Sequence, residues 1–148
     1  MAGKKQNLFF WRLIFLCYSA LMLWLLFGQR VGSIAYTQHL AQGMNLTPFA
    51  TLKRYWQLLR SSDGALVRHA FINLAGNVVM FIPLGYLLPR AFPQLRKFFK
   101  TLFLATLMIL LIEAVQYFTR LGSCDVDDLI LNIPGVILGF WLYRILRR

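Results

Sequence analysis

Four long apolar stretches constrain this chain more than any other feature of its sequence. They cover about residues 8–27, 70–88, 101–118 and 129–146, and each is close to the roughly 20 residues that a membrane-crossing helix needs. Apolar residues make up 59% of the 148 residues and charged residues 14%, whereas about 25% is charged in an average soluble domain. The sequence therefore predicts one all-α integral membrane domain over residues 1–148, a four-helix bundle, and argues against disordered or disulfide-rich secreted chains.

The first stretch has an alternative reading as a cleaved signal peptide. Lys4 and Lys5 would form its basic end, and Val31-Gly32-Ser33 resembles a cleavage site. However, the apolar run exceeds the roughly 7–15 residues of a signal core. We therefore expect it to remain as the first span.

The cations indicate an orientation. Ten of the 16 Lys and Arg residues lie before the first span, between the second and third spans, or at the C-terminal end. Positively charged loops stay in the cytoplasm, so both termini are predicted to be cytoplasmic. All five acidic residues lie on the opposite side, in outer loops or outer halves of spans: Asp63, Glu113, Asp125, Asp127 and Asp128. The net charge of +11 thus reports topology, and no nucleic-acid partner is predicted.

The first outer loop, residues 28–69, contains a helix signal. Thr47 followed by Pro48 is typical of a capping hydroxyl and a proline at the first helical position. Apolar side chains then recur at helical spacing, at Leu52, Tyr55, Trp56 and Leu59. This pattern predicts a short amphipathic helix, lying either in the lipid headgroup layer or packed on the end of the bundle.

Polar side chains inside spans are costly, so their positions are informative. Several fall about 5–10 Å below the outer ends of three predicted helices. We expect them to line a polar pocket open to the outer leaflet, whose candidate ligand-binding residues are Arg68, Asn73, Asn77, Glu113, Gln116, Arg120, Asp125, Asp127, Asp128 and Asn132.

Purely structural roles also account for these polar and small residues. Asn and Gln often only join membrane helices to one another. Asp125 and Asp128 have the spacing of a helix cap. Gly135 and Gly139 form a surface of small residues suited to close helix packing, and the oligomeric state stays open.

Such a pocket admits three kinds of chemistry. Asp125, Asp127 and Asp128 could hold a divalent ion such as Mg²⁺ or Ca²⁺, although no metal or other cofactor is assigned. Glu113 or Asp127 could act as a general acid or base. Arg68 and Arg120 could bind a phosphate or pyrophosphate head group.

The residues that carry these features also resemble a known family, the VanZ-like proteins of bacterial membranes. The similar stretches are Asn45 to Phe49 (NLTPF), Asn73 to Pro89 (NLAGNVVMFIPLGYLLP), Glu113 to Arg120 (EAVQYFTR) and Asp125 to Gly139 (DVDDLILNIPGVILG). The resemblance implies a multi-pass protein of the bacterial cytoplasmic membrane that alters susceptibility to teicoplanin-type, lipid-bearing glycopeptides. Pro134 departs from the expected pattern and predicts a kink, or a fourth span that begins near Asn132.

Three functions follow as hypotheses. The first is an accessory membrane protein whose pocket binds a lipid-linked head group, such as that of a cell-wall precursor. The second is a small membrane hydrolase or transferase that acts on such a precursor through Glu113 or Asp127. The third, a transport subunit, is disfavoured because the inner halves of the spans are almost entirely apolar.

Overall fold

The structure, a computed structural model, describes residues 2–28, 45–119 and 125–147. Within these ranges the chain forms helices and no β-strand. Four helical segments are long and apolar enough to cross a membrane: Asn7–Gly28, Gly64–Ala91, Phe98–Thr119 and Val126–Leu146. The predicted all-α architecture with four spans is confirmed.

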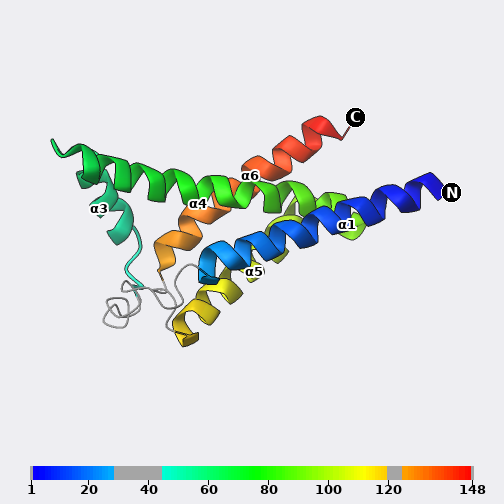
Figure 1. The fold of residues 1–148 in the computed structure, drawn as a ribbon, viewed down its shortest axis with the longest axis horizontal. Coiled ribbons are helices and arrows are strands. Elements are labelled where there is room, and N and C mark those ends of the chain that lie inside the picture. The colour runs from blue at the N-terminus through cyan, green and yellow to red at the C-terminus, as the bar shows by residue number, and fades with distance from the viewer. Residues whose placement is uncertain (1, 29–44, 120–124, 148) are drawn as a thin grey trace.

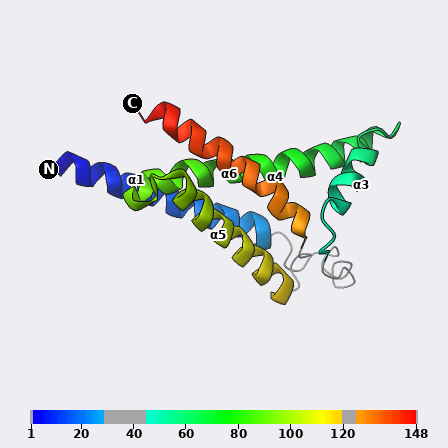
Figure 2. The ribbon, with the colours of Figure 1, turned by 180° about the vertical axis from the view of Figure 1, so that it is seen from behind.

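The helices follow one another in the order drawn in Figure 1. They are α1 (Ala2–Leu23), the short π-helix η1 (Trp24–Gly28), α3 (Ala50–Leu58), α4 (Gly64–Ala91), the 3-10 turn η2 (Pro93–Leu95), α5 (Phe98–Thr119) and α6 (Val126–Leu146). The start of α1 and the end of α6 lie on one side of the molecule, and α3 lies on the other (Figures 1 and 2). We call these sides the terminal end and the α3 end.

Two spans begin earlier than the hydropathy indicated, because a capping aspartate sets each start. Asp63 accepts a hydrogen bond from the Ala65 N–H at 2.8 Å, at the start of α4. Asp125 accepts one from the Asp127 N–H at 2.9 Å, at the start of α6. The alternative start near Asn132 is therefore wrong: Pro134 lies inside a continuous helix.

Glycines bring α4 and α6 into backbone contact where the two helices cross. A Cβ atom built on Gly139 would lie 2.0 Å from the Ile82 carbonyl oxygen, and one on Gly135 would lie 2.1 Å from that of Val78. On the other helix, a Cβ on Gly85 would lie 2.0 Å from the Val136 oxygen. The small-residue surface predicted on the fourth span thus packs against α4 within the same chain.

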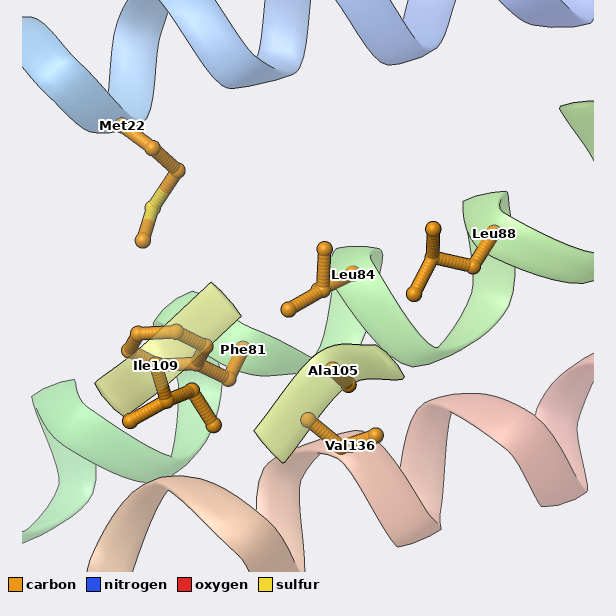
Figure 3. Packing of buried hydrophobic residues seen from close by; sticks show 7 residues of the cluster. All are labelled: Met22, Phe81, Leu84, Leu88, Ala105, Ile109 and Val136. Carbon is orange, nitrogen blue, oxygen red and sulfur yellow. The ribbon is translucent and has the colours of Figure 1, made fainter. Parts of the chain in front are cut away.

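The hydrophobic core lies where α1, α4, α5 and α6 approach one another. Figure 3 shows Met22 of α1 pointing towards three side chains of α4, with α5 and α6 completing the cluster: Phe81, Leu84, Leu88, Ala105, Ile109 and Val136. The α1 helix is also tied by its Tyr18 hydroxyl, which donates to the Met80 carbonyl at 2.8 Å. Many large apolar side chains face outward, such as Phe118 at 81% exposure, as lipid-facing surfaces do.

At the terminal end, arginine side chains donate hydrogen bonds to the last carbonyl groups of α4 and α6. The Arg12 Nε donates to the Ala91 carbonyl at 3.3 Å, at the last residue of α4. The Arg90 guanidinium donates to the Leu146 carbonyl at 2.8 Å, at the last residue of α6, and stacks 4.9 Å from the Trp11 ring. Cations at helix C-termini are favourable because the last carbonyl groups carry partial negative charge.

Candidate functional site

The α3 end holds a network of polar groups centred on the start of α6. Asp125 is the residue before the helix and has an extended backbone, while Asp127 and Asp128 lie in the first turn. Acidic residues are favourable there because free N–H groups make a helix N-terminus positive. This preference suits all three carboxylates, and that of Asp125 accepts an N–H group of α6 itself.

Asp127 binds the start of a second helix, α3. Its carboxylate accepts hydrogen bonds from the backbone N–H groups of Phe49 at 2.6 Å, Thr51 at 2.7 Å and Leu52 at 3.0 Å. The side chain is fully buried. Asp127 therefore caps α3 from across the fold, and both of its oxygens are engaged in doing so.

The sequence predicted that the Thr47 hydroxyl caps this helix, and that prediction is wrong. Thr47 and Pro48 form a turn, and the helix begins only at Ala50, after Phe49 in a left-handed conformation with φ of 65°. No side chain of the segment itself caps the helix, because the buried Asp127 supplies that function.

Asp125 joins the same segment through its side chain and its backbone. The carboxylate accepts from the Thr51 hydroxyl at 2.5 Å and from the Asn45 amide at 3.3 Å. The Val126 N–H donates to the Asn45 carbonyl at 3.1 Å. Residues 45–52 are thereby fixed to the start of α6 by several hydrogen bonds.

Glu113 brings α5 into the network. The Asp125 backbone N–H donates to its Oε2 atom at 3.4 Å, and Glu113 is 7% exposed. Gln116, one turn further along α5, is also buried. Glu113 of α5 therefore contacts the residue that precedes α6.

The two asparagines of α4 differ in their contacts. The Asn77 side chain donates to Asp128 Oδ1 at 2.9 Å and links α4 to α6. The Asn73 side chain donates to the His69 carbonyl of its own helix at 2.8 Å. Asn77 is part of the network, whereas the hydrogen bond of the Asn73 side chain stays within α4.

Asn132 lies about 10 Å along α6 from its start. It is buried, and its Oδ1 atom has no hydrogen-bond partner within residues 2–28, 45–119 and 125–147. Buried polar atoms are nearly always paired in proteins, so an unpaired oxygen at this depth requires an explanation.

The outer surface of this end is basic. Lys53 and Arg54 of α3 are exposed, as are Arg60 after α3 and Arg68 near the start of α4. Leu52, Tyr55 and Leu59 on the other face of α3 are partly buried, and α3 packs against α4. The expected amphipathic helix is present, and its contacts favour the reading in which it packs on the bundle.

The charges of the network affect the pKa of the Tyr55 phenol. Burial raises the pKa of its phenol, and the Asp128 carboxylate raises it further, while Arg54 opposes this. Its ring lies 6.2 Å from that of His69 on α4. Tyr55 of α3 therefore lies near both α4 and the acidic start of α6.

Four residues of this end were not among the predicted site residues: Asn45, Phe49, Thr51 and Tyr55, the last predicted only as part of the apolar face of the short helix. The signal was present in part, since Asn45 to Phe49 is one of the stretches that carry the family resemblance. Among the predicted residues, Arg68 is exposed on α4, and Arg120 lies outside the described residues.

The carboxylate oxygens of Asp125 and Asp127 already accept hydrogen bonds from the protein, which would compete with a divalent ion. Both Asp127 oxygens accept backbone N–H groups, and Asp125 accepts from Asn45 and Thr51. In the part of the chain that the structure describes, no three His, Cys, Asp or Glu residues are placed to hold a metal ion.

Two cavities are formed by other residues. One, of about 190 Å³, is apolar and lies between α1, α4 and α5 beside Tyr18, Met22 and Met108. The other, of about 330 Å³, lies at the terminal end beside Arg96 and Arg144. Neither is lined by any of the candidate site residues.

Comparison with known proteins gives two matches. The chain matches the family described as VanZ/LLP1 over residues 14–147. It is 28% identical over 127 residues to "Protein VanZ" of Enterococcus faecium, an alignment that covers 85% of this chain and 68% of that protein. No solved structure matches significantly.

Proposed function

Since the chain belongs to the VanZ/LLP1 family, we propose that it binds a lipid-linked head group at the α3 end and thereby lowers susceptibility to teicoplanin-type glycopeptides. The proposed location is the bacterial cytoplasmic membrane, with the α3 end on the outer face. The head group belongs to a lipid carrier of a cell-wall precursor. The protein acts by holding this ligand and not by altering it.

The observation that carries this proposal is the unpaired Asn132 oxygen. It is buried on α6, a helix whose start contacts the buried Glu113 of α5. Burying an amide oxygen without a partner costs about 1–3 kcal/mol in proteins. A hydroxyl or amide donor, such as sugar and peptide head groups carry, would remove this cost by donating to Asn132 once the surrounding helices moved to admit it, since neither cavity described above reaches this residue.

Charge at the same end supports an anionic ligand. Lys53, Arg54 and Arg68 are exposed, and the described residues show no ion pair for any of them. Phosphate and pyrophosphate linkers are bound by such cations. The carboxylates of Asp125 and Asp127, in contrast, accept hydrogen bonds from N–H and hydroxyl groups of residues 45–52, so they hold α3 in place.

The hypothesis of an enzyme would rest on Glu113. Asp127 is a poor acid or base, because its two oxygens accept three backbone N–H groups. Mass spectrometry of the lipids of cells with and without the protein separates the two functions. A binding protein leaves lipid chemistry unchanged, whereas an enzyme produces a new or missing lipid.

The test is the growth of bacteria that express the protein at rising teicoplanin concentrations. We expect Asn132→Leu and Glu113→Gln to lose the tolerance that the unaltered protein confers, at equal membrane abundance. Asn73→Leu is the matched control, because the Asn73 side chain bonds its own helix. Retained tolerance in both site variants, or no tolerance from the unaltered protein, would contradict the proposal.

A further inference from the structure

A hollow lined by cations and aromatic rings lies at the terminal end, far from the polar network. The hollow of about 330 Å³ is formed between the start of α5 and the last turns of α6. Three cations and three aromatic residues line it: Arg96, Lys97, Phe98, Phe140, Trp141 and Arg144. We call it the basic hollow.

The walls of the basic hollow are fixed by packing. The Phe98 and Phe140 rings meet edge to face at 5.3 Å and join α5 to α6. The buried Thr101 hydroxyl donates to the Leu95 carbonyl and so holds the turn that carries Arg96 and Lys97. The hollow therefore exists before any ligand arrives, which lowers the cost of binding.

The cations of the basic hollow carry uncompensated charge. Arg96, Lys97 and Arg144 are exposed, and their side chains have no hydrogen-bond or ion-pair partner in the described ranges. All Asp and Glu residues of the chain lie towards the other end. For example, Glu113 is 15 residues along α5 from Phe98, which is about 22 Å.

The aromatic residues place the basic hollow at the level of a membrane surface. It lies where two candidate spans end, and Trp141 is 56% exposed beside Arg144. Tryptophan is enriched at the boundary between lipid tails and headgroups. Basic pockets between spans on the cytoplasmic side suit anionic lipid headgroups, and the cation distribution predicts this end to be cytoplasmic.

We propose that the basic hollow binds the phosphate of an anionic phospholipid of the inner leaflet, with the acyl chains lying along the exposed Trp141. Arg96 and Arg144 donate to the phosphate oxygens from opposite walls, and Lys97 adds positive charge. The proposal does not depend on the function assigned to the α3 end.

The test uses the full chain, purified in a neutral detergent, with native mass spectrometry during titration with phosphatidylglycerol or phosphatidylcholine. We expect phosphatidylglycerol to bind more tightly. Lys97→Gln with Arg144→Gln should weaken its binding by about fivefold for each cation removed. Lys100→Gln with Arg147→Gln is the matched control, since it removes the same charge at the same end from residues that do not line the hollow.

Three results would overturn the proposal. Equal weakening by both double variants would show that binding follows overall charge. Equal affinity for phosphatidylcholine, in which a choline cation offsets the same phosphate, would show that the net negative charge of the lipid is not recognised. Displacement of the bound lipid by millimolar inorganic phosphate would identify the hollow as a site for a soluble anion. Circular dichroism of each variant confirms that the helices are intact.

Discussion

Replacing Asp127 by Asn tests how the α3 end is held together. The carboxylate accepts three backbone N–H groups at the start of α3, one on Oδ1 and two on Oδ2. An asparagine side chain keeps one oxygen and presents an NH₂ group to donors in place of the other. At least one hydrogen bond is lost, and the rest no longer involve a charge.

The expected magnitude follows from these contacts. A hydrogen bond to a charged group contributes about 1.5–3 kcal/mol, and a carboxylate at a helix N-terminus adds about 0.3–1 kcal/mol. Together they give a loss of about 3 kcal/mol for local opening of α3. Because about 1.4 kcal/mol corresponds to a factor of ten, amide hydrogen exchange over residues 50–58 should become roughly 100-fold faster.

The assay is hydrogen exchange with mass spectrometry on the purified chain in detergent. Asp63→Asn is the matched control, because Asp63 is exposed, accepts one N–H of α4, and asparagine caps helices about as well as aspartate. It should change exchange at the start of α4 by no more than about threefold. If Asp127→Asn left α3 exchange as slow as in the unaltered protein, the capping role would be refuted.

Two further predictions concern packing and pH. Gly139→Ala should strongly reduce membrane abundance and the thermal unfolding midpoint, because its Cβ would lie 2.0 Å from the Ile82 oxygen. Gly76→Ala is the control and should be tolerated, because a Cβ there has no neighbouring atom within 4 Å. Equal behaviour of the two variants would contradict the close crossing of α4 and α6. Burial and the Asp128 carboxylate raise the pKa of Tyr55 in the folded protein. The neutral phenol therefore stabilises the fold below the ordinary tyrosine pKa of about 10. This stabilisation is lost as the pH rises above that value. Thermal unfolding of the unaltered protein should therefore weaken more steeply above that pH than that of Tyr55→Phe, and parallel curves would refute this.

The spans could be predicted because hydropathy is a local property of the sequence. The starts of α4 and α6 could not be placed from apolar content, since Asp63 and Asp125 extend both helices into polar sequence. Pro134 was given too much weight, because a membrane helix can continue through a proline when neighbouring helices support it. The error was therefore one of boundaries and not of architecture.

The site was predicted only in part. Spacing along each helix indicated that Glu113 and the aspartates share one end, and the contact of Glu113 with Asp125 agrees with this. Asp127, however, caps a helix that lies 75 residues away in the chain. The residue pattern of a single segment cannot indicate such a distant partner. The sequence therefore suggested that the Asp127 carboxylate was available for a ligand, whereas it caps α3.

The central claim is that the α3 end faces the cell exterior, and thiol labelling tests it most directly. In a chain with Cys17→Ser and Cys124→Ser, single cysteines are placed by Ser62→Cys at the α3 end and by Gln94→Cys in η2, both at exposed positions. An impermeant maleimide applied to spheroplasts should label Ser62→Cys at once and Gln94→Cys only after lysis. The opposite pattern would contradict the account.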